Sequence, residues 1–586
     1  MLDDADGHAS GAAGWRFHFT PACMVHRVRL TASVLLALVS VASADGQPLR
    51  RVQVNGSLTT SADFYSQTGR RYDVRPPAVG GIQGQINVTL PGGITLPFSA
   101  YISTEGDAGY QQPFNQIGAS PAWRWGRAHG GYFSTRFTDL TLADARLLGG
   151  GLELTPGPMR VGAVYGRAQR AVEADSLRGR LPLFERQLAA VQLGVGRETG
   201  WHLWLTGLRA KDDAASLNAL PTTIRPEENL VLSAAFGGRV GRYASLRGEV
   251  AGSAWTGNTL SDTLALDDPD LQVWLDRLDP LVKINASTRL DYAGTATLDV
   301  TPVPMLTVGL QGRLVGPGFK SLGAQQTEAD VLDVLVAPTL RLSRVQAAVR
   351  VGLRQNNVAG TRLETRHRAL YAANVAARLT DALSVTVDAS NYGLRTSQEV
   401  DTLRVASVAR SFSIAPAYTI RRGRASHSLT GAYAYQDLVD ENLTSGRETA
   451  TRNHTFTATH AWALGNGLAL TTNATYVSGL TRDLTTTMLT LSENVQHRLM
   501  RGKLTLGGGL SYTQSTVPGT PTTPSAAVSD QTDRGVNTRL RAAYRLSRQS
   551  TFEASANTRL FRYGAPRAGQ DGLREGTARV AYTYSF

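Results

Sequence analysis

The chain ends in Ala578-Arg579-Val580-Ala581-Tyr582-Thr583-Tyr584-Ser585-Phe586. Along this stretch apolar residues alternate with polar or small ones, at Ala578, Val580, Tyr582, Tyr584 and Phe586. A period of two residues places the two sets on opposite faces of a β-strand. The strand is therefore apolar on one face only, and it stops at an aromatic residue with no tail. A soluble protein has little reason to end in this way.

This terminus resembles the closing strand of bacterial outer-membrane β-barrels. In those proteins the C-terminal aromatic residue is the signal that the barrel-assembly machinery recognises. The resemblance implies that this machinery is a partner during biogenesis. It also implies an assembly signal made of Val580, Tyr582, Tyr584 and Phe586.

The N-terminal region predicts export from the cytoplasm. A basic segment from Met24 to Arg29 precedes an apolar run from Leu35 to Val39, and Ala42-Ser43-Ala44 forms a small-x-small cleavage site. These features predict a secretory signal peptide over residues 24–44. We interpret residues 1–23 as a start site assigned too far upstream, with a genuine N-terminal extension as the alternative. The only cysteine lies there, so we expect no disulfide in the exported chain.

Composition narrows the fold class further. Hydrophobic residues make up 42% of the sequence, yet after residue 44 no apolar run is long enough for a membrane helix. Membrane proteins without such runs must be closed barrels, because backbone polar groups in lipid need internal partners. The net charge of +13 comes mainly from arginine. These arginines are scattered singly along alternating strands, so we predict no nucleic-acid partner.

One unit recurs along the chain: a strand, a tight turn, a second strand and a longer loop. Residues 345–354 and 504–512 show the alternation most clearly. The count of such units predicts about 26 strands, with 22 to 26 as the acceptable range. A soluble sandwich can also alternate, but the polar set here is Gly, Ser, Thr, Asn, Gln and Arg, with little bulky core.

We therefore predict an all-β fold: a closed antiparallel transmembrane β-barrel over residues 45–586. Its location would be the bacterial outer membrane, in contact with lipid and lipopolysaccharide. The predicted signal peptide and Phe586 place both ends in the periplasm, so short turns would face the periplasm and long loops the outside. Trp123 and Trp125, expected before a turn at Gly126-Arg127, fit an interfacial aromatic girdle.

The segment from Pro113-Phe114-Asn115-Gln116 to Tyr165-Gly166-Arg167 also resembles part of large outer-membrane barrels from Bacteroidota-like bacteria. Those proteins are mostly uncharacterised. The resemblance therefore implies a location and a fold, and no reaction.

Motifs for catalysis or cofactor binding are not found. His454 and His460 share one strand face, either as a metal or acid–base pair or as polar residues near an interface, and we favour the latter. His129 and Ser134 fall on opposite strand faces, which argues against a catalytic pair. We predict no catalytic residue, no cofactor and no metal site.

Alternation assigns a set of charged residues to the barrel interior: Arg247, Glu249, Arg313, Arg350, Arg354, Glu553, Arg559 and Arg579. Two interpretations remain open. The arginines could create a positive field that favours anionic solutes. They could instead pair with glutamates on neighbouring strands and only support the wall.

In the longest loop, residues 256–285, the sequence predicts a short amphipathic helix near the middle. We predict that it folds into the lumen as a constriction, through Asp267, Asp268, Asp270, Trp274, Asp276 and Asp279. The alternatives are that it docks a partner or caps the rim over lipopolysaccharide. Its aspartates match no known calcium-loop spacing, although a calcium site stays an alternative.

These features predict a porin-like channel for small or medium solutes. Few residues separate Asp45 from the first strand, so we expect no N-terminal plug domain and no complete TonB-dependent receptor. The first alternative is a structural or translocon-type barrel whose lumen is filled by loops or by a periplasmic protein or lipoprotein partner. The second is a hydrolase with a site on the barrel rim.

Overall fold

The computed structural model describes residues 52–69, 75–105, 115–175, 180–219, 221, 223–262, 281–324, 328–397, 406–440, 450–481, 484–519, 530–567 and 570–586. The predicted signal peptide and upstream segment lie outside these residues. No helix within them is long and apolar enough to cross a membrane. The described residues include two 3₁₀ helices of three residues each, η2 (Ala214–Ser216) and η3 (Met500–Gly502).

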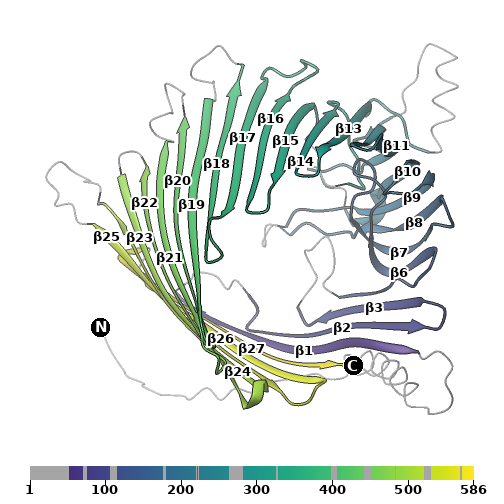
Figure 1. The fold of residues 1–586 in the computed structure, drawn as a ribbon. Coiled ribbons are helices and arrows are strands. Elements are labelled where there is room, and N and C mark those ends of the chain that lie inside the picture. The colour runs from purple at the N-terminus through teal and green to yellow at the C-terminus, as the bar shows by residue number, and fades with distance from the viewer. Residues whose placement is uncertain are drawn as a thin grey trace, which may run out of the picture.

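Strands make up nearly all the regular structure (Figure 1). In chain order they are β1 (Gln53–Thr68), β2 (Ala78–Leu90), β3 (Ile94–Ser103), β4 (Gln116–Ala119), β5 (Ala122–Trp123), β6 (Gly126–Thr135), β7 (Ala145–Leu154), β8 (Met159–Gln169), β9 (Glu185–Gly196), β10 (His202–Asp213), β11 (Glu228–Val240), β12 (Ala244–Thr256), β13 (Thr288–Val303), β14 (Leu306–Val315), β15 (Val331–Arg341), β16 (Val345–Asn356), β17 (Arg366–Arg378), β18 (Leu383–Thr396), β19 (Ala406–Arg422), β20 (Ala425–Asp440), β21 (Thr451–Ala463), β22 (Leu468–Thr481), β23 (Leu484–Leu499), β24 (Leu504–Val517), β25 (Gln531–Arg545), β26 (Ser550–Arg567) and β27 (Gln570–Ser585).

The sheet closes on itself. Each strand pairs antiparallel with the next, and β1 pairs with β27 from Ser57↔Ser585 to Thr68↔Arg574. Beyond this ladder, Gly56 and Phe586 exchange backbone hydrogen bonds of 2.9 and 3.1 Å. Both β4 and β5 lie between β3 and β6, so they are two pieces of one interrupted strand. The 27 strand segments therefore form a closed wall of 26, as the sequence predicted.

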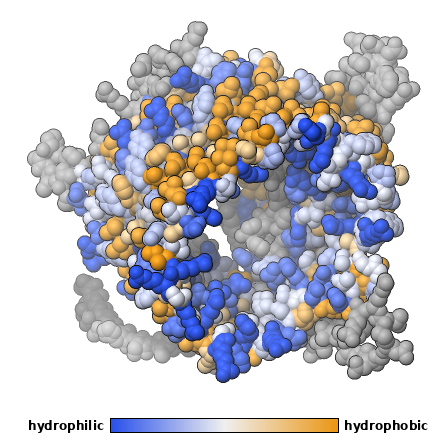
Figure 2. Space-filling model, in the orientation of Figure 1, coloured by the Kyte–Doolittle hydropathy of each residue, from blue (hydrophilic) through white to orange (hydrophobic). Residues whose placement is uncertain are grey.

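The outer face of the wall is apolar. On β24, Leu506 and Leu510 are 41% and 55% exposed, and on β27 Val580 and Tyr582 are 38% and 39% exposed. Large apolar side chains are exposed in this way around the ring. Figure 2 shows them among the polar residues of the wall, and the face is hollowed near its centre. Such exposure has a high free-energy cost in water and is favourable against lipid.

Connections differ between the two ends of the barrel. Gln53 and Phe586 lie at the end with short turns, such as residues 91–93, 155–158 and 464–467. One predicted turn is misplaced: Gly126 and Arg127 belong to β6, and the turn is Arg124-Trp125. Gly126 permits this tight hairpin, because a Cβ there would lie 2.5 Å from the Trp123 ring.

Candidate functional site

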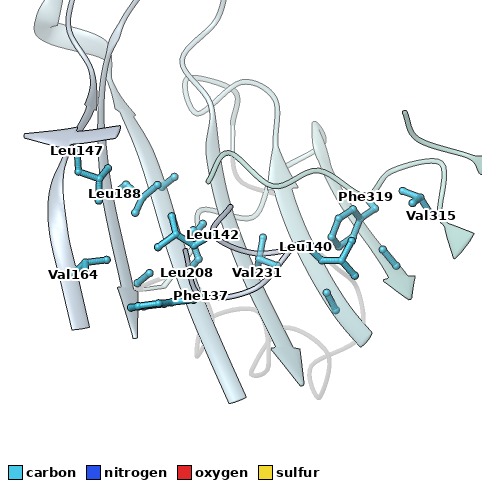
Figure 3. Close-up of a cluster of buried hydrophobic side chains, with 14 of the residues drawn as sticks. Phe137, Leu140, Leu142, Leu147, Val164, Leu188, Leu208, Val231, Val315 and Phe319 are labelled. Carbon is cyan, nitrogen blue, oxygen red and sulfur yellow. The ribbon is translucent and has the colours of Figure 1, made fainter. Parts of the chain in front are cut away.

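Two long-end connections fold back into the barrel. They are residues 136–144, between β6 and β7, and residues 316–324, between β14 and β15; we call them the inner loops. Phe137, Leu140 and Leu142 of the first and Phe319 of the second are at most 4% exposed. Figure 3 shows them over the strands that carry Leu147, Val164, Leu188, Leu208 and Val231. A conventional buried apolar core therefore fills one arc of the interior.

A buried carboxylate anchors the first inner loop to the wall. Glu249 on β12 is 5% exposed, and its Oε2 accepts hydrogen bonds from the backbone N–H groups of Asp139 (3.0 Å) and Leu140 (3.1 Å). The Thr141 hydroxyl donates to Ser233 Oγ on β11 over 2.7 Å. These bonds satisfy polar groups that would otherwise be buried without partners.

The second inner loop is held by both the wall and the first loop. The Lys320 carbonyl accepts hydrogen bonds from Asn229 Nδ2 (3.0 Å) and Ser253 Oγ (2.5 Å). Ser321 Oγ donates to the Thr141 carbonyl over 2.7 Å. Apolar packing and hydrogen bonds together make the inner loops a fixed partition of the lumen.

Sequence reasoning did not identify this partition. It placed the constriction at Asp267, Asp268, Asp270, Trp274, Asp276 and Asp279, all of which lie outside the described residues. Residues 137–142 break the two-residue alternation at Thr138 and Asp139, so their sequence is typical of a connection. It does not predict that this connection is buried, because the packing partners come from β8 to β12, far away in the sequence.

Most of the charged residues assigned to the interior lie beside an opposite charge. Arg247 contacts Asp299 (3.3 Å), Arg354 binds Asp333 (2.8 Å) and Glu553 binds Arg541 (3.0 Å). Arg313 lies 3.9 Å from Asp333, and Arg579 lies 3.5 Å from Asp63. These contacts agree with the interpretation in which the charged residues pair across neighbouring strands and support the wall.

Arg350 and Arg559 are different. Within the described residues no carboxylate lies within 4.0 Å of either, and the same holds for Arg539, which sequence analysis did not single out. Arg539 Nε donates to Asn557 Oδ1 (3.2 Å), and the Arg559 guanidinium lies 5.7 Å from the Phe561 ring. Arg539 and Arg559 line a cavity of about 460 Å³ with Asn494, Asn537, Asn557 and Glu575.

A second polar cluster joins a serine, a histidine and a carboxylate. Ser120, at the break between β4 and β5, lies 2.9 Å from His129 Nδ1, measured from its Oγ. His129 Nε2 lies 3.1 Å from Glu153 Oε1, and Thr135 Oγ1 donates to Glu153 over 2.6 Å. His129 is 8% exposed and stacks on Phe133, with ring centroids 4.6 Å apart.

This cluster contains His129 but not the serine that sequence analysis weighed. Ser134 is exposed on the outer side of β6, whereas its neighbours Phe133 and Thr135 are buried on the inner side. The missed residue, Ser120, is nine positions before His129 and reaches it because β4 and β6 are paired. Sequence alone gives no such pairing.

The remaining noted histidines lie on the outer face. His460 Nε2 is 3.2 Å from His427 Nδ1, and His427 stacks on Trp462 at 5.5 Å. His454 Nδ1 is 3.0 Å from the Tyr433 hydroxyl. Within the described residues, no group of three or more His, Cys, Asp or Glu side chains could hold a metal.

The sequence matches no protein-family model and no curated protein sequence. Several solved structures are similar at low identity. A ferric enterobactin receptor (PfeA) mutant from Pseudomonas aeruginosa is 10% identical, with a TM-score of 0.44 over 92% of this chain and 81% of that one. The FrpB iron transporter from Neisseria meningitidis is 10% identical, with a TM-score of 0.39 over 92% and 82%. OccK8 (OprE) from Pseudomonas aeruginosa is 9% identical, with a TM-score of 0.30 over 91% and 98%.

These likenesses are distant, and the expected similarity to Bacteroidota-like barrels finds no support among them. The fold assignment rests on the strand pairing itself. A closed ring satisfies every strand edge, its exterior is apolar, and its interior carries charged and amide side chains. These are the properties that membrane-spanning barrels require. The chain is therefore a transmembrane β-barrel of the bacterial outer membrane.

Proposed function

We propose that this barrel is a porin-like channel for small or medium solutes, with a preference for anions. The observation that carries the proposal is the uneven interior. The inner loops fill the arc of β6 to β14, while β16, β25 and β26 expose Arg350, Arg539 and Arg559 with no carboxylate within 4.0 Å in the described part of the chain. Glu575, the cross-strand neighbour of Arg559, accepts a hydrogen bond from the Tyr65 hydroxyl.

The inner loops and the interior arginines each have a physical consequence for conduction. A barrel with more strands than a 16–18-stranded porin would leave a wide aqueous lumen if nothing filled it, so the inner loops reduce its cross-section. Guanidinium groups without an anionic partner attract anions and repel cations at the wall. The proposed path therefore runs between the inner loops and the arginine-bearing arc.

Conductance of the full-length protein in planar bilayers tests this proposal. We expect single channels whose reversal potential in a KCl gradient indicates chloride preference. Replacing Arg350, Arg539 and Arg559 together with glutamine should shift that potential toward the potassium value. Replacing three arginines of the outer face, Arg534, Arg562 and Arg574, removes the same charge and should leave it unchanged.

A bilayer that stays sealed after verified insertion would contradict the channel proposal. Co-purification of a stoichiometric periplasmic protein or lipoprotein would then favour the translocon-type alternative. Channels with unchanged selectivity in the interior triple variant would contradict the anion preference alone.

A further inference from the structure

We propose that Ser120, His129 and Glu153 form a serine hydrolase site that cleaves carboxylic esters inside the lumen. The inference is separate from the channel proposal. It rests on a continuous hydrogen-bonded chain of nucleophile, base and acid, and on the cavity into which the nucleophile opens.

The hydrogen bonds fix the proton positions. Glu153 can only accept from His129 Nε2, so Nε2 carries the proton and Nδ1 is free to accept one from Ser120 Oγ. The serine therefore faces a base oriented by a carboxylate, which is the arrangement that activates a hydroxyl nucleophile. The two ring nitrogens are exchanged relative to the chymotrypsin arrangement, but the three roles are complete.

The break in the strand leaves the Ser120 side chain accessible from the cavity. The strand breaks at Ser120-Pro121, where Ser120 N donates to the Pro97 carbonyl (3.1 Å) and Ala128 N to the Pro121 carbonyl (2.8 Å). Interruptions of this kind re-aim side chains and are frequent next to active sites. His129 is locked between Phe133 and Glu153, so its ring position is predetermined.

Ser120 lines a cavity of about 560 Å³ on the inner wall of β1 to β4. Asn55, Gln85 and Asn87 line the same cavity and carry amide N–H groups. Side-chain amides can stabilise a developing oxyanion. The lining also includes Ile86, Phe98 and Tyr132, so the cavity offers both polar and apolar contacts to a small ester.

The reaction balances with water as the only co-substrate. Ser120 Oγ attacks the ester carbonyl carbon as its proton passes to His129 Nδ1, and an N–H group of the amides that line the cavity donates to the oxyanion. The tetrahedral intermediate collapses, the C–O bond to the alcohol breaks, and His129 protonates the leaving oxygen. Water then attacks the acyl-serine through the same base, releasing the acid and restoring Ser120.

The test uses the purified full-length barrel, p-nitrophenyl acetate and a fluorophosphonate probe. We expect hydrolysis that Ser120→Ala lowers at least about 100-fold, and a single phosphonyl adduct on Ser120 detected by mass spectrometry. Ser134→Ala, on the opposite face of β6, should change neither. Heat-modifiable gel migration confirms that each variant is folded.

Glu153→Gln separates catalysis from structure. The amide oxygen of the new side chain would still accept from Nε2 but carries no charge, so the rate should fall and the acid limb of its pH profile should move lower. Equal rates for Ser120→Ala and wild type, or a probe that labels folded protein elsewhere than Ser120, would overturn the proposal.

A different observation carries a second inference, on the outer face. Arg534 on β25 and Arg562 on β26 are direct cross-strand partners, and Arg574 on β27 is offset from Arg562 by two residues. Their even positions share the face of the exposed Leu540, Leu560 and Val580. All three are exposed, with no carboxylate within 4.0 Å in the described part of the chain. Like charges placed directly opposite are unfavourable, so an anion bound between them would relieve the repulsion.

The distance of these arginines from the short-turn end of the barrel indicates which anion they meet. Arg562 is about 12 residues along β26 from its short-turn end, which at the usual rise and tilt is roughly 30 Å up the barrel. The apolar band of such barrels is about 25 Å tall. Thr538 and Thr558 lie on the same face below the arginines and hydrogen-bond each other, as groups in lipid must. We infer that Arg534, Arg562 and Arg574 bind the phosphates of lipopolysaccharide in the outer leaflet.

Native mass spectrometry of the full-length barrel with added lipid A tests this inference. The Arg534→Gln, Arg562→Gln, Arg574→Gln variant should bind bisphosphorylated lipid A about tenfold more weakly or worse. Dephosphorylated lipid A should bind the wild-type protein as weakly as bisphosphorylated lipid A binds the triple variant. Inorganic phosphate should not displace lipid A. The triple variant Arg501→Gln, Arg545→Gln, Arg548→Gln removes the same charge at the short-turn end and should bind normally. Normal binding by the Arg534, Arg562, Arg574 variant, equal loss in the short-turn variant, or displacement by inorganic phosphate would overturn the inference.

Discussion

At the scale of single residues, alternation along a strand identifies the side of the wall but not the role. Glu249 and Glu553 were both assigned to the interior on that basis. Glu249 is buried beneath the first inner loop, whereas Glu553 lies beside Arg541 on an open part of the wall. The difference depends on residues 136–144, which are far from Glu249 in sequence. For the same reason Ser120 could not be matched to His129 in advance.

Glu249→Ala should weaken the anchoring of the first inner loop. It leaves the N–H groups of Asp139 and Leu140 without acceptors, and for the buried Leu140 N–H the cost is about 1–3 kcal/mol. We expect a lower thermal unfolding midpoint in detergent and faster proteolysis within residues 136–144. Glu553→Ala removes only an exposed ion pair and should lower the midpoint little. Equal shifts for the two variants would show that the Glu249 bonds are not what holds the loop.

At the scale of elements, the strands were predictable and the inner loops were not. A wall strand must alternate because lipid lies on one side and the interior on the other, so its sequence carries the pattern locally. An inner loop packs through contacts with β8 to β12 that no local pattern records. The constriction predicted for residues 256–285 was based on the amphipathic pattern of a helix, which a sequence can show. That constriction stays a prediction.

Gly323 lies at a tight contact of the second inner loop with the wall and with the first inner loop. A Cβ there would lie 2.2 Å from Leu208 Cδ1 and 2.8 Å from the Thr141 carbonyl, and Ala143 N donates to the Gly323 carbonyl over 3.0 Å. Gly323→Val should therefore displace residues 316–324 and change single-channel conductance. Gly312→Val, where nothing lies within 4 Å, is the matched control. If the folded Gly323→Val variant has unchanged conductance, the inner loops do not line the conduction path.

At the scale of the whole molecule, the seam between β1 and β27 makes the sheet a barrel. The even strand number, the closure and the short-turn end were predicted because a membrane wall admits no free edge. The seam ends at Phe586, whose ring lies 5.8 Å from that of Tyr584. Val580 and Tyr582 are exposed on the same strand. Their role as an assembly signal stays a prediction.

Phe586→Ala tests that role, because it keeps the backbone bonds to Gly56 and removes only the ring. We expect a lower yield of heat-modifiable, membrane-inserted protein in cells. Phe552→Ala removes an exposed aromatic residue near the same end of the barrel and should assemble at close to the normal yield. Normal yield for Phe586→Ala would indicate that the terminal aromatic ring is dispensable for recognition.

The position of the buried cluster constrains the order in which the molecule can form. Every member of that cluster lies between Phe133 and Phe319, whereas the seam joins residues near the two chain ends. The inner loops can therefore pack against their own strands while the ends of the sheet are still apart. If the β1–β27 ladder forms last, no bulky segment has to enter a ring that is already closed.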